Sequence, residues 1–159
     1  KGFLRLKTGK VVNNIFEARN ALTQRTYGPK SEASVRLDIS QMREGDHAGL
    51  STYCSKPGTI EIVVENGVRY LLTTDRTEEK ARVAYNSDIV YLRVDADFTT
   101  DNAIFLYSQD GEEWKQLGDS FHMVFNLEHF VGNRFAIFNY ATKQSGGWVD
   151  VDWFHFQKD

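Results

Sequence analysis

The sequence has a single cysteine, Cys54, so no disulfide can form within the chain and the fold must rest on packing alone. It also lacks any apolar run long enough to cross a bilayer, and its start does not look like a signal peptide. With 19 Lys and Arg residues against 22 Asp and Glu residues, the net charge is -3, and there is no excess of basic residues. We therefore expect neither nucleic acid nor a membrane as a partner.

Three kinds of catalytic or metal-binding pattern are missing. The sequence contains no Glu-x-Asp-x-x-Glu pattern, which typically supplies the acid and the nucleophile of a sandwich that cleaves β-glucans. Glu61 and Glu65 share a strand face, but we expect them to be solvated. No Gly-x-Ser-x-Gly turn is present for a serine nucleophile. The histidines have no zinc-ligand spacing; they are His47, His122, His129 and His155.

What the chain does have is enough apolar material for one substantial core. Hydrophobic residues make up 41% of its 159 residues and aromatic residues 13%. We expect a single domain over residues 1–159. Because the sequence begins with Lys1, we also expect it to be a piece of a longer polypeptide.

Alternating and turn patterns predict an all-β fold. Apolar and polar residues alternate over 31–39 and over 88–98, and Asn66-Gly67 joins two strand-like runs as a hairpin. Residues 75–80 suggest a loop, and only 126–132 suggest a helical turn. About ten short strands without a long helical period predict an antiparallel β-sandwich of two packed sheets. The other expected strands are 3–6, 15–26, 47–55, 103–108, 113–117, 134–142 and a closing strand after Gly147.

The closing strand carries the first candidate for chemistry. Strict alternation places Val149, Val151 and Trp153 on the core side. It places Trp148, Asp150, Asp152 and Phe154 on the other side. Two neighbouring carboxylates must be solvated, hydrogen-bonded or neutralised by a cation, because an unpaired buried charge is costly.

Four motifs, in this order and spacing, suggest a family: residues 18–29, residues 44–50, the Tyr107-Ser-Gln-Asp-Gly turn with Trp114, and the stretch 146–154. The chain resembles, over nearly its whole length, the C-terminal concanavalin A-like β-sandwich (a jelly roll) of family 43 glycoside hydrolases, the β-xylosidases and arabinofuranosidases. Domains of this kind usually begin with a further strand, which does not precede Lys1 here.

The resemblance implies a non-catalytic carbohydrate-binding or accessory module of a xylan- or arabinoxylan-degrading enzyme. Its expected partners are xylan, or xylo- or arabino-oligosaccharide, and the catalytic domain of the same polypeptide. The first alternative is an architectural domain that docks on a propeller-shaped catalytic domain and completes its active site. The second is an independent glycan-cleaving enzyme. The sequence leaves open whether the protein is secreted or cytoplasmic in a microbe.

A sugar-binding face needs flat aromatic rings for stacking and a few polar groups that fix orientation. If their strands are neighbours, the candidates for this role are Trp148, Asp150, Tyr91, Arg93, Arg19, Tyr53 and Tyr140. Aromatic residues also dominate protein cores, and for Phe105, Tyr107, Trp114 and Trp153 we expect packing instead of binding.

No cofactor is expected to be required, but the resemblance implies a possible structural calcium ion. Asp152 is the expected ligand, with Glu17 as a second ligand if its strand runs alongside, since carboxylate oxygens suit this ion. The competing interpretation, which we favour, is that Asp150 and Asp152 accept hydrogen bonds from arginine or backbone donors.

Overall fold

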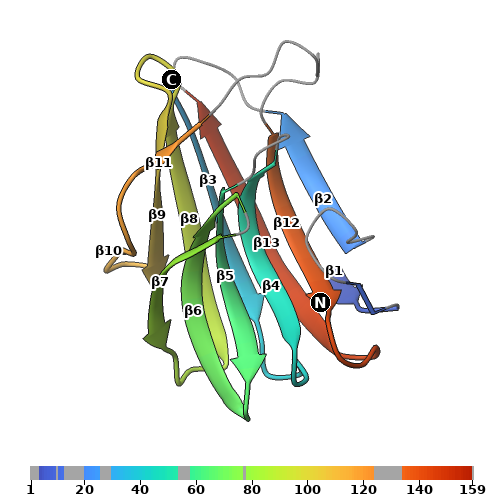
Figure 1. Ribbon diagram of the computed structural model, residues 1–159. Coiled ribbons are helices and arrows are strands. Elements are labelled where there is room, and N and C mark those ends of the chain that lie inside the picture. The colour runs from blue at the N-terminus through green and yellow to red at the C-terminus, as the bar shows by residue number, and fades with distance from the viewer. Residues whose placement is uncertain are drawn as a thin grey trace.

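The computed structural model describes residues 4–9, 11–12, 20–25, 30–53, 58–76, 78–123 and 134–158. Within these ranges the chain forms two antiparallel sheets that pack face to face (Figure 1). Cys54 and the predicted helical turn at 126–132 lie outside the described residues. No helix in these ranges has the length and apolarity that a membrane crossing requires.

The first sheet, sheet A, has seven strands. Their order is β1 (Leu4–Lys7), β13 (Trp148–Lys158), β3 (Lys30–Asp38), β8 (Ile89–Asp97), β9 (Asn102–Ser108) and β10 (Lys115–Gln116), with β11 (Phe121–His122) also paired to β9. The second, sheet B, has six. Their order is β2 (Asn20–Arg25), β12 (Arg134–Ala141), β4 (Asp46–Tyr53), β5 (Gly58–Glu65), β6 (Val68–Asp75) and β7 (Glu78–Ala84).

The core lies between the sheets and is built from alternate residues of their strands. In β3 and β8 the apolar set predicted from alternation is buried, including Val35, Leu37 and Leu92, each with no exposed surface. Sheet B faces them with Leu50, Ile60, Ile62, Leu71, Phe135 and Ile137, among others. The all-β sandwich predicted from the sequence is therefore confirmed.

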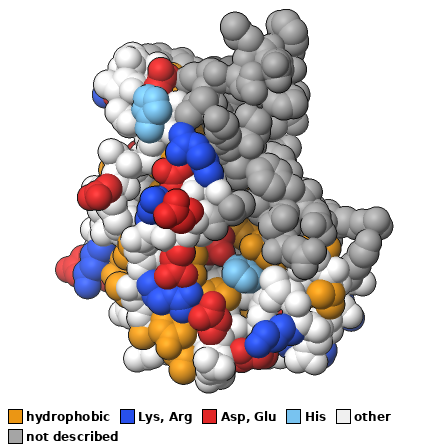
Figure 2. All heavy atoms as spheres, viewed as in Figure 1, with side chains coloured by type: hydrophobic (Ala, Val, Ile, Leu, Met, Phe, Trp, Pro, Cys, Tyr) orange, Lys and Arg blue, Asp and Glu red, His pale blue; other side chains and the backbone are white. Residues whose placement is uncertain are grey.

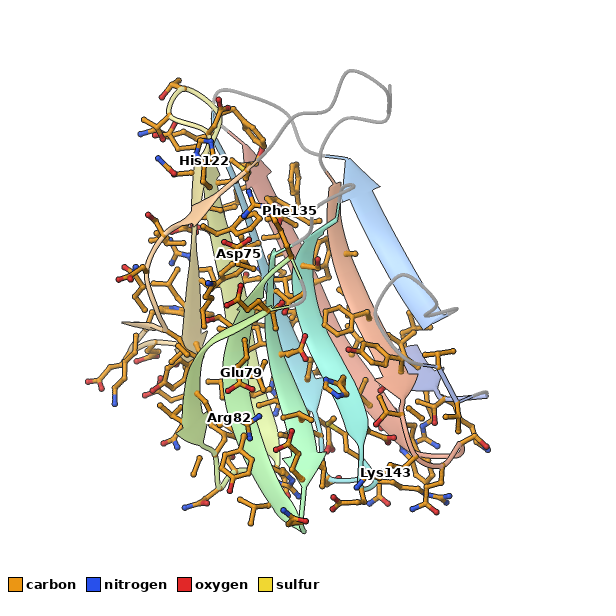
Figure 3. The ribbon with its side chains drawn as sticks, in the orientation of Figure 1. Asp75, Glu79, Arg82, His122, Phe135 and Lys143 are labelled. Carbon is orange, nitrogen blue, oxygen red and sulfur yellow. The ribbon has the colours of Figure 1, made fainter. Side chains whose placement is uncertain are left out.

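The described ranges hold thirteen strands, against about ten expected and eleven named from the sequence, because two strands were missed. The charged stretch predicted as a loop begins β7, where Arg82 binds Glu79 and Glu65 (Figure 3). Charged side chains favour solvent but not a particular backbone, so an edge strand can carry them. The second missed strand, β11, is only two residues long.

The hairpin at Asn66-Gly67 is confirmed. Asn66 and Gly67 both adopt positive φ angles, 53° and 73°, as a tight turn between twisted strands requires. The Glu44 carboxylate accepts hydrogen bonds from both of their backbone N–H groups, at 2.6 and 2.8 Å. These bonds lower the pKa of Glu44, so the carboxylate that holds the turn stays ionised at neutral pH.

A β-bulge in β13 overturns the predicted faces of the closing strand. Val151 pairs with Leu37, but Trp153 pairs with Arg36, so Asp152 is an extra residue in the ladder. Beyond the bulge the alternation is reversed. Phe154, predicted to face outward, packs against the core. Trp153, predicted to share the core side with Val149 and Val151, lies on the opposite face beside Tyr91.

This geometry predicts different stability costs for two aromatic truncations. Phe135 is 1% exposed and lies in the core, so Phe135→Ala should cost about 3–5 kcal/mol of unfolding free energy. Trp153→Ala should cost clearly less, because the Trp153 ring keeps contact with solvent. Equilibrium urea unfolding followed by circular dichroism measures both. An equal loss for the two variants would mean that Trp153 is a core residue after all.

Candidate ligand-binding face

The side of sheet A that faces away from the core, called here the outer face, is a regular grid of polar and aromatic side chains. Neighbouring strands β13, β3, β8 and β9 lie side by side (Figure 1) and contribute one residue each to every row. The ladder register gives three successive rows: Trp153, Arg36, Tyr91 and Ser108; then His155, Ser34, Arg93 and Leu106; then Gln157, Glu32, Asp95 and Ile104.

Trp153 and Tyr91 of the first row and His155 of the second form what is called here the aromatic band. The Trp153 ring centroid lies 5.8 Å from that of Tyr91 and 4.4 Å from that of His155, both in tilted arrangements. The Arg36 guanidinium lies 5.7 Å from the Tyr91 ring centroid and donates a hydrogen bond to the Tyr91 hydroxyl at 3.1 Å. These contacts hold the rings in fixed positions while leaving Trp153 and Tyr91 only partly buried.

A polar groove of about 440 Å³ lies farther along the same strands, beginning at the third row. That volume falls within the range of small-molecule sites. From Tyr91 to Asp97 the band and groove together extend roughly 20 Å along β8, at about 3.3 Å per residue. The groove is lined by Lys30, Ser31, Glu32, Asp95, Ala96, Asp97, Thr100, Asn102, Ile104 and Gln157.

Arg93, in the second row, lies between the aromatic band and the polar groove. Its Nε and Nη2 atoms donate to the two oxygens of Asp95 at 2.7 and 2.9 Å, and Nη2 also lies 2.6 Å from a Glu32 oxygen. The hydrogen bonds to Asp95 raise the pKa of Arg93. Its guanidinium carbon lies 5.6 Å from the Trp114 ring centroid. Arg93 therefore binds two carboxylates of the groove and lies over the ring of Trp114.

Another carboxylate, that of Asp97, lies at the end of the groove. Asp97 accepts hydrogen bonds from the hydroxyl and backbone N–H of Thr99, at 2.6 and 2.9 Å. These donors, with the positive charge of Lys30, lower the pKa of the Asp97 carboxyl. Asp97 is therefore negatively charged at neutral pH.

Trp148 and Asp150 lie on the same outer face, on the part of β13 before the bulge. Arg5 on β1 donates to both Asp150 oxygens at 2.9 and 3.2 Å, and its guanidinium carbon lies 4.8 Å from the Trp148 ring centroid. The hydrogen bonds to Asp150 raise the pKa of Arg5. The favoured interpretation of Asp150, a hydrogen-bond acceptor for arginine, matches this geometry.

The structure does not bring the seven predicted ligand-binding residues together. Tyr91, Arg93, Trp148 and Asp150 share the outer face of sheet A. Tyr140, however, lies on β12 of sheet B, and Tyr53 on β4 of the same sheet. The side chain of Tyr53 and the whole of Arg19 lie outside the described residues. The prediction of one shared site is therefore wrong for Tyr140, because alternation gives the face of a strand but not its sheet.

Tyr140 belongs to a separate polar cluster in sheet B. Its ring stacks on His47 at 4.7 Å, and the His47 Nδ1 atom lies 2.7 Å from Glu61 Oε1. Thr59 donates a hydrogen bond to the other Glu61 oxygen at 2.8 Å. Burial raises the pKa of the Tyr140 hydroxyl, so it stays protonated. Glu61, predicted to be solvated, is only 3% exposed, and it stays buried because these two partners bind its oxygens.

Gly49 explains why Glu61 can lie so close to the sheet. A Cβ atom at Gly49 would approach the Ile60 carbonyl oxygen to 2.2 Å and the Glu61 Cβ to 2.8 Å. The absence of a side chain at Gly49 leaves room for the Glu61 Cβ directly opposite it in the β4–β5 ladder.

Asp152, the predicted calcium ligand, pairs with an arginine instead of with other acidic groups. One of its oxygens lies 2.6 Å from Arg36 Nη1, and its side chain is 43% exposed. Among the described residues, no group of three or more His, Cys, Asp or Glu side chains could hold a metal ion. The described surroundings of Asp152 therefore do not fit calcium. Glu17 lies outside the described residues, so a site that includes it stays a prediction.

Several residues of the groove and of the aromatic band were not predicted as site residues from the sequence. Alternation correctly placed Glu32, Arg36 and Asp95 on the solvent side of their strands. Their convergence depends on the order β13, β3, β8, β9, in which β3 and β8 pair although about fifty residues separate them in the chain. No local pattern in the sequence specifies that order.

The chain matches a known protein family over almost its whole length. Residues 1–157 match the sequence profile of the β-xylosidase C-terminal concanavalin A-like domain. The chain belongs to this family. The concanavalin A-like sandwich inferred from the four sequence motifs is thereby confirmed, as is the relation to family 43 glycoside hydrolases.

Individual relatives are similar to this chain in sequence and in structure. A β-xylosidase of Formosa agariphila is 28% identical over 180 aligned positions, which span 99% of this chain and 30% of that protein. A bifunctional GH43-CE protein of Bacteroides eggerthii has a TM-score of 0.96 and 41% identity, over 100% of this chain and 21% of that one.

A third relative is a GH43 glycoside hydrolase engineered to display both endo-xylanase and exo-arabinofuranosidase activity. It has a TM-score of 0.93 and 30% identity, over 98% of this chain and 34% of that one. The chain thus spans a third or less of the length of its relatives. The matching profile is that of the C-terminal concanavalin A-like domain of such proteins.

The ion pair at Asp152 leads to a prediction about calcium. A half-exposed pair contributes at most about 1 kcal/mol, so Asp152→Asn should lower the melting temperature by no more than about 4 °C. The loss should be the same in calcium and in chelator. A loss that occurs only in calcium would show that Asp152 binds the ion, since a ligand stabilises the state that binds it.

Proposed function

We propose that this chain is a non-catalytic accessory module of a xylan- or arabinoxylan-degrading enzyme, and that it binds a xylo- or arabino-oligosaccharide segment on the outer face of sheet A. The observation that carries the proposal is that the polar groove and the aromatic band lie on the same face, in successive rows of the same strands. Partly exposed rings at one end and amide and carboxylate groups at the other are the two elements of a sugar site.

The chemistry of each part suits a pyranose chain. The partly exposed ring of Trp153 offers a flat apolar surface to the C–H face of a sugar. Asn102 and Gln157, which line the groove, offer both donors and acceptors to sugar hydroxyls. Since Arg36 and Arg93 already hold their neighbours in place, little side-chain entropy remains to be lost on binding.

The same contacts argue against hydrolysis by this face. A glycosidase needs one carboxyl group to protonate the leaving oxygen and another to act as nucleophile or base. Glu32 and Asp95 both bind the Arg93 guanidinium, which occupies the oxygens that such roles require. We infer that the reaction belongs to another domain of the same polypeptide, which is the second expected partner.

An architectural role is the second candidate. It is favoured by the small share that this domain has in its relatives, 21% to 34% of the solved chains, which leaves a large remainder for it to pack against. In that case the outer face would serve as a contact surface for the catalytic domain, and free xylan would not bind to it.

Titration calorimetry with xylohexaose and an arabinose-substituted xylo-oligosaccharide distinguishes the two roles. Binding is expected, and Trp153→Ala should weaken it about tenfold, the effect of losing one stacking ring of about 1.4 kcal/mol. Tyr70→Ala is the matched control. Tyr70 also carries an arginine over its ring, with Arg82 at 4.6 Å, but it lies on sheet B, so its loss should leave the affinity unchanged.

Melting curves on the same samples show whether each variant is folded. Absence of binding by the folded parent chain would favour the architectural role. Equal weakening by Trp153→Ala and Tyr70→Ala would place the ligand elsewhere.

A further inference from the structure

The charges around the polar groove suggest which xylan segments it accepts. Three carboxylates line it, Glu32, Asp95 and Asp97, together with the cation Lys30. A second cation, Arg93 in the neighbouring row, binds Glu32 and Asp95. Three negative charges minus two positive charges leave an excess of one negative charge among the described groups. His122, which pairs with Asn102 at the edge of the groove, is exposed.

Both cations lie next to carboxylates of the fold, and Arg93 is bound to two of them. Arg93 uses Nε and Nη2, the edge that would receive a carboxylate in bidentate fashion, to bind Asp95 and Glu32. Lys30 lies opposite Asp97 in the ladder between β3 and β8, and its charge acts on the Asp97 carboxyl. An incoming anion would therefore have to displace a carboxylate from this edge of Arg93, or share Lys30 with Asp97.

We propose that the groove selects neutral xylan segments, unsubstituted or arabinose-substituted, and discriminates against segments that carry a uronic acid branch. This inference rests on the proposed sugar-binding function of the outer face. Neutral sugar hydroxyls can share the oxygens of Glu32, Asp95 and Asp97 as acceptors without disturbing the ion pairs. A uronate carboxylate adds a like charge to a site that is already negative.

The expected size of the effect follows from the charge separation. One excess charge about 7 Å from the ligand carboxylate, at an effective dielectric constant between that of the protein surface and that of water, weakens binding about three- to tenfold. Because the groove is open to solvent, salt should screen the effect. At 1 M ionic strength the Debye length is about 3 Å, and the discrimination should nearly vanish.

The test compares three ligands by calorimetry at pH 8 and low salt: a neutral xylo-oligosaccharide, the same oligosaccharide with one uronic acid branch, and its carboxyl-reduced form. The acid should bind three- to tenfold more weakly than the other two, which should bind alike. Glu32→Gln and Asp97→Asn should each bring the ratio of affinities closer to one. The control Glu79→Gln, on sheet B beside Arg82, should leave the ratio unchanged (Figure 3).

The outcomes distinguish a failure of this inference alone from a failure of the function on which it rests. If the acid binds as tightly as its reduced form, the charge selection is wrong while sugar binding stands. If the reduced form is as weak as the acid, the branch is rejected by its bulk, and the charge selection is again wrong. If none of the three ligands binds to the folded chain, the proposed function fails together with the inference.

Discussion

The extra residue at Asp152 in β13 determines which side chains of the closing strand face the core and which face solvent. Before it, Val149 and Val151 are buried; after it, Phe154 packs inward and Trp153 turns outward. A strand without the bulge would bury Trp153 and expose Phe154, because a shift of one residue exchanges the two faces. The aromatic band beside Tyr91 thus depends on this single irregularity in the ladder.

On the outer face, ion pairs hold the aromatic rings in position. Arg5, Arg36 and Arg93 each bind a carboxylate on the same or a neighbouring strand and lie over a ring. Each exposed pair contributes little to stability by itself. Together they fix the positions of rings and acceptors, which is what recognition of a flexible sugar chain requires. In the view of Figure 2, charged side chains of both signs are interspersed among the described residues.

The sequence predicted the fold better than the site. Clean alternation in β3 and β8 and the Asn66-Gly67 turn were sufficient because they depend on local period and backbone conformation. The bulge was not predictable, since nothing in Val151-Asp152-Trp153 distinguishes an extra residue from continued alternation. Nor was the burial of Glu61, which depends on His47 and on the missing side chain of Gly49 in the neighbouring strand. The place of Tyr140 depends on strand order, which is a long-range property.

The central claim is that a xylan segment binds along the outer face of sheet A, and an NMR titration of the ¹⁵N-labelled chain with xylohexaose tests it most directly. The account predicts saturable shifts at the amides of β3, β8 and the part of β13 after the bulge, and at the indole N–H of Trp153. Shifts confined to sheet B, around His47 and Tyr140, would contradict it. So would a spectrum that stays unchanged at millimolar ligand.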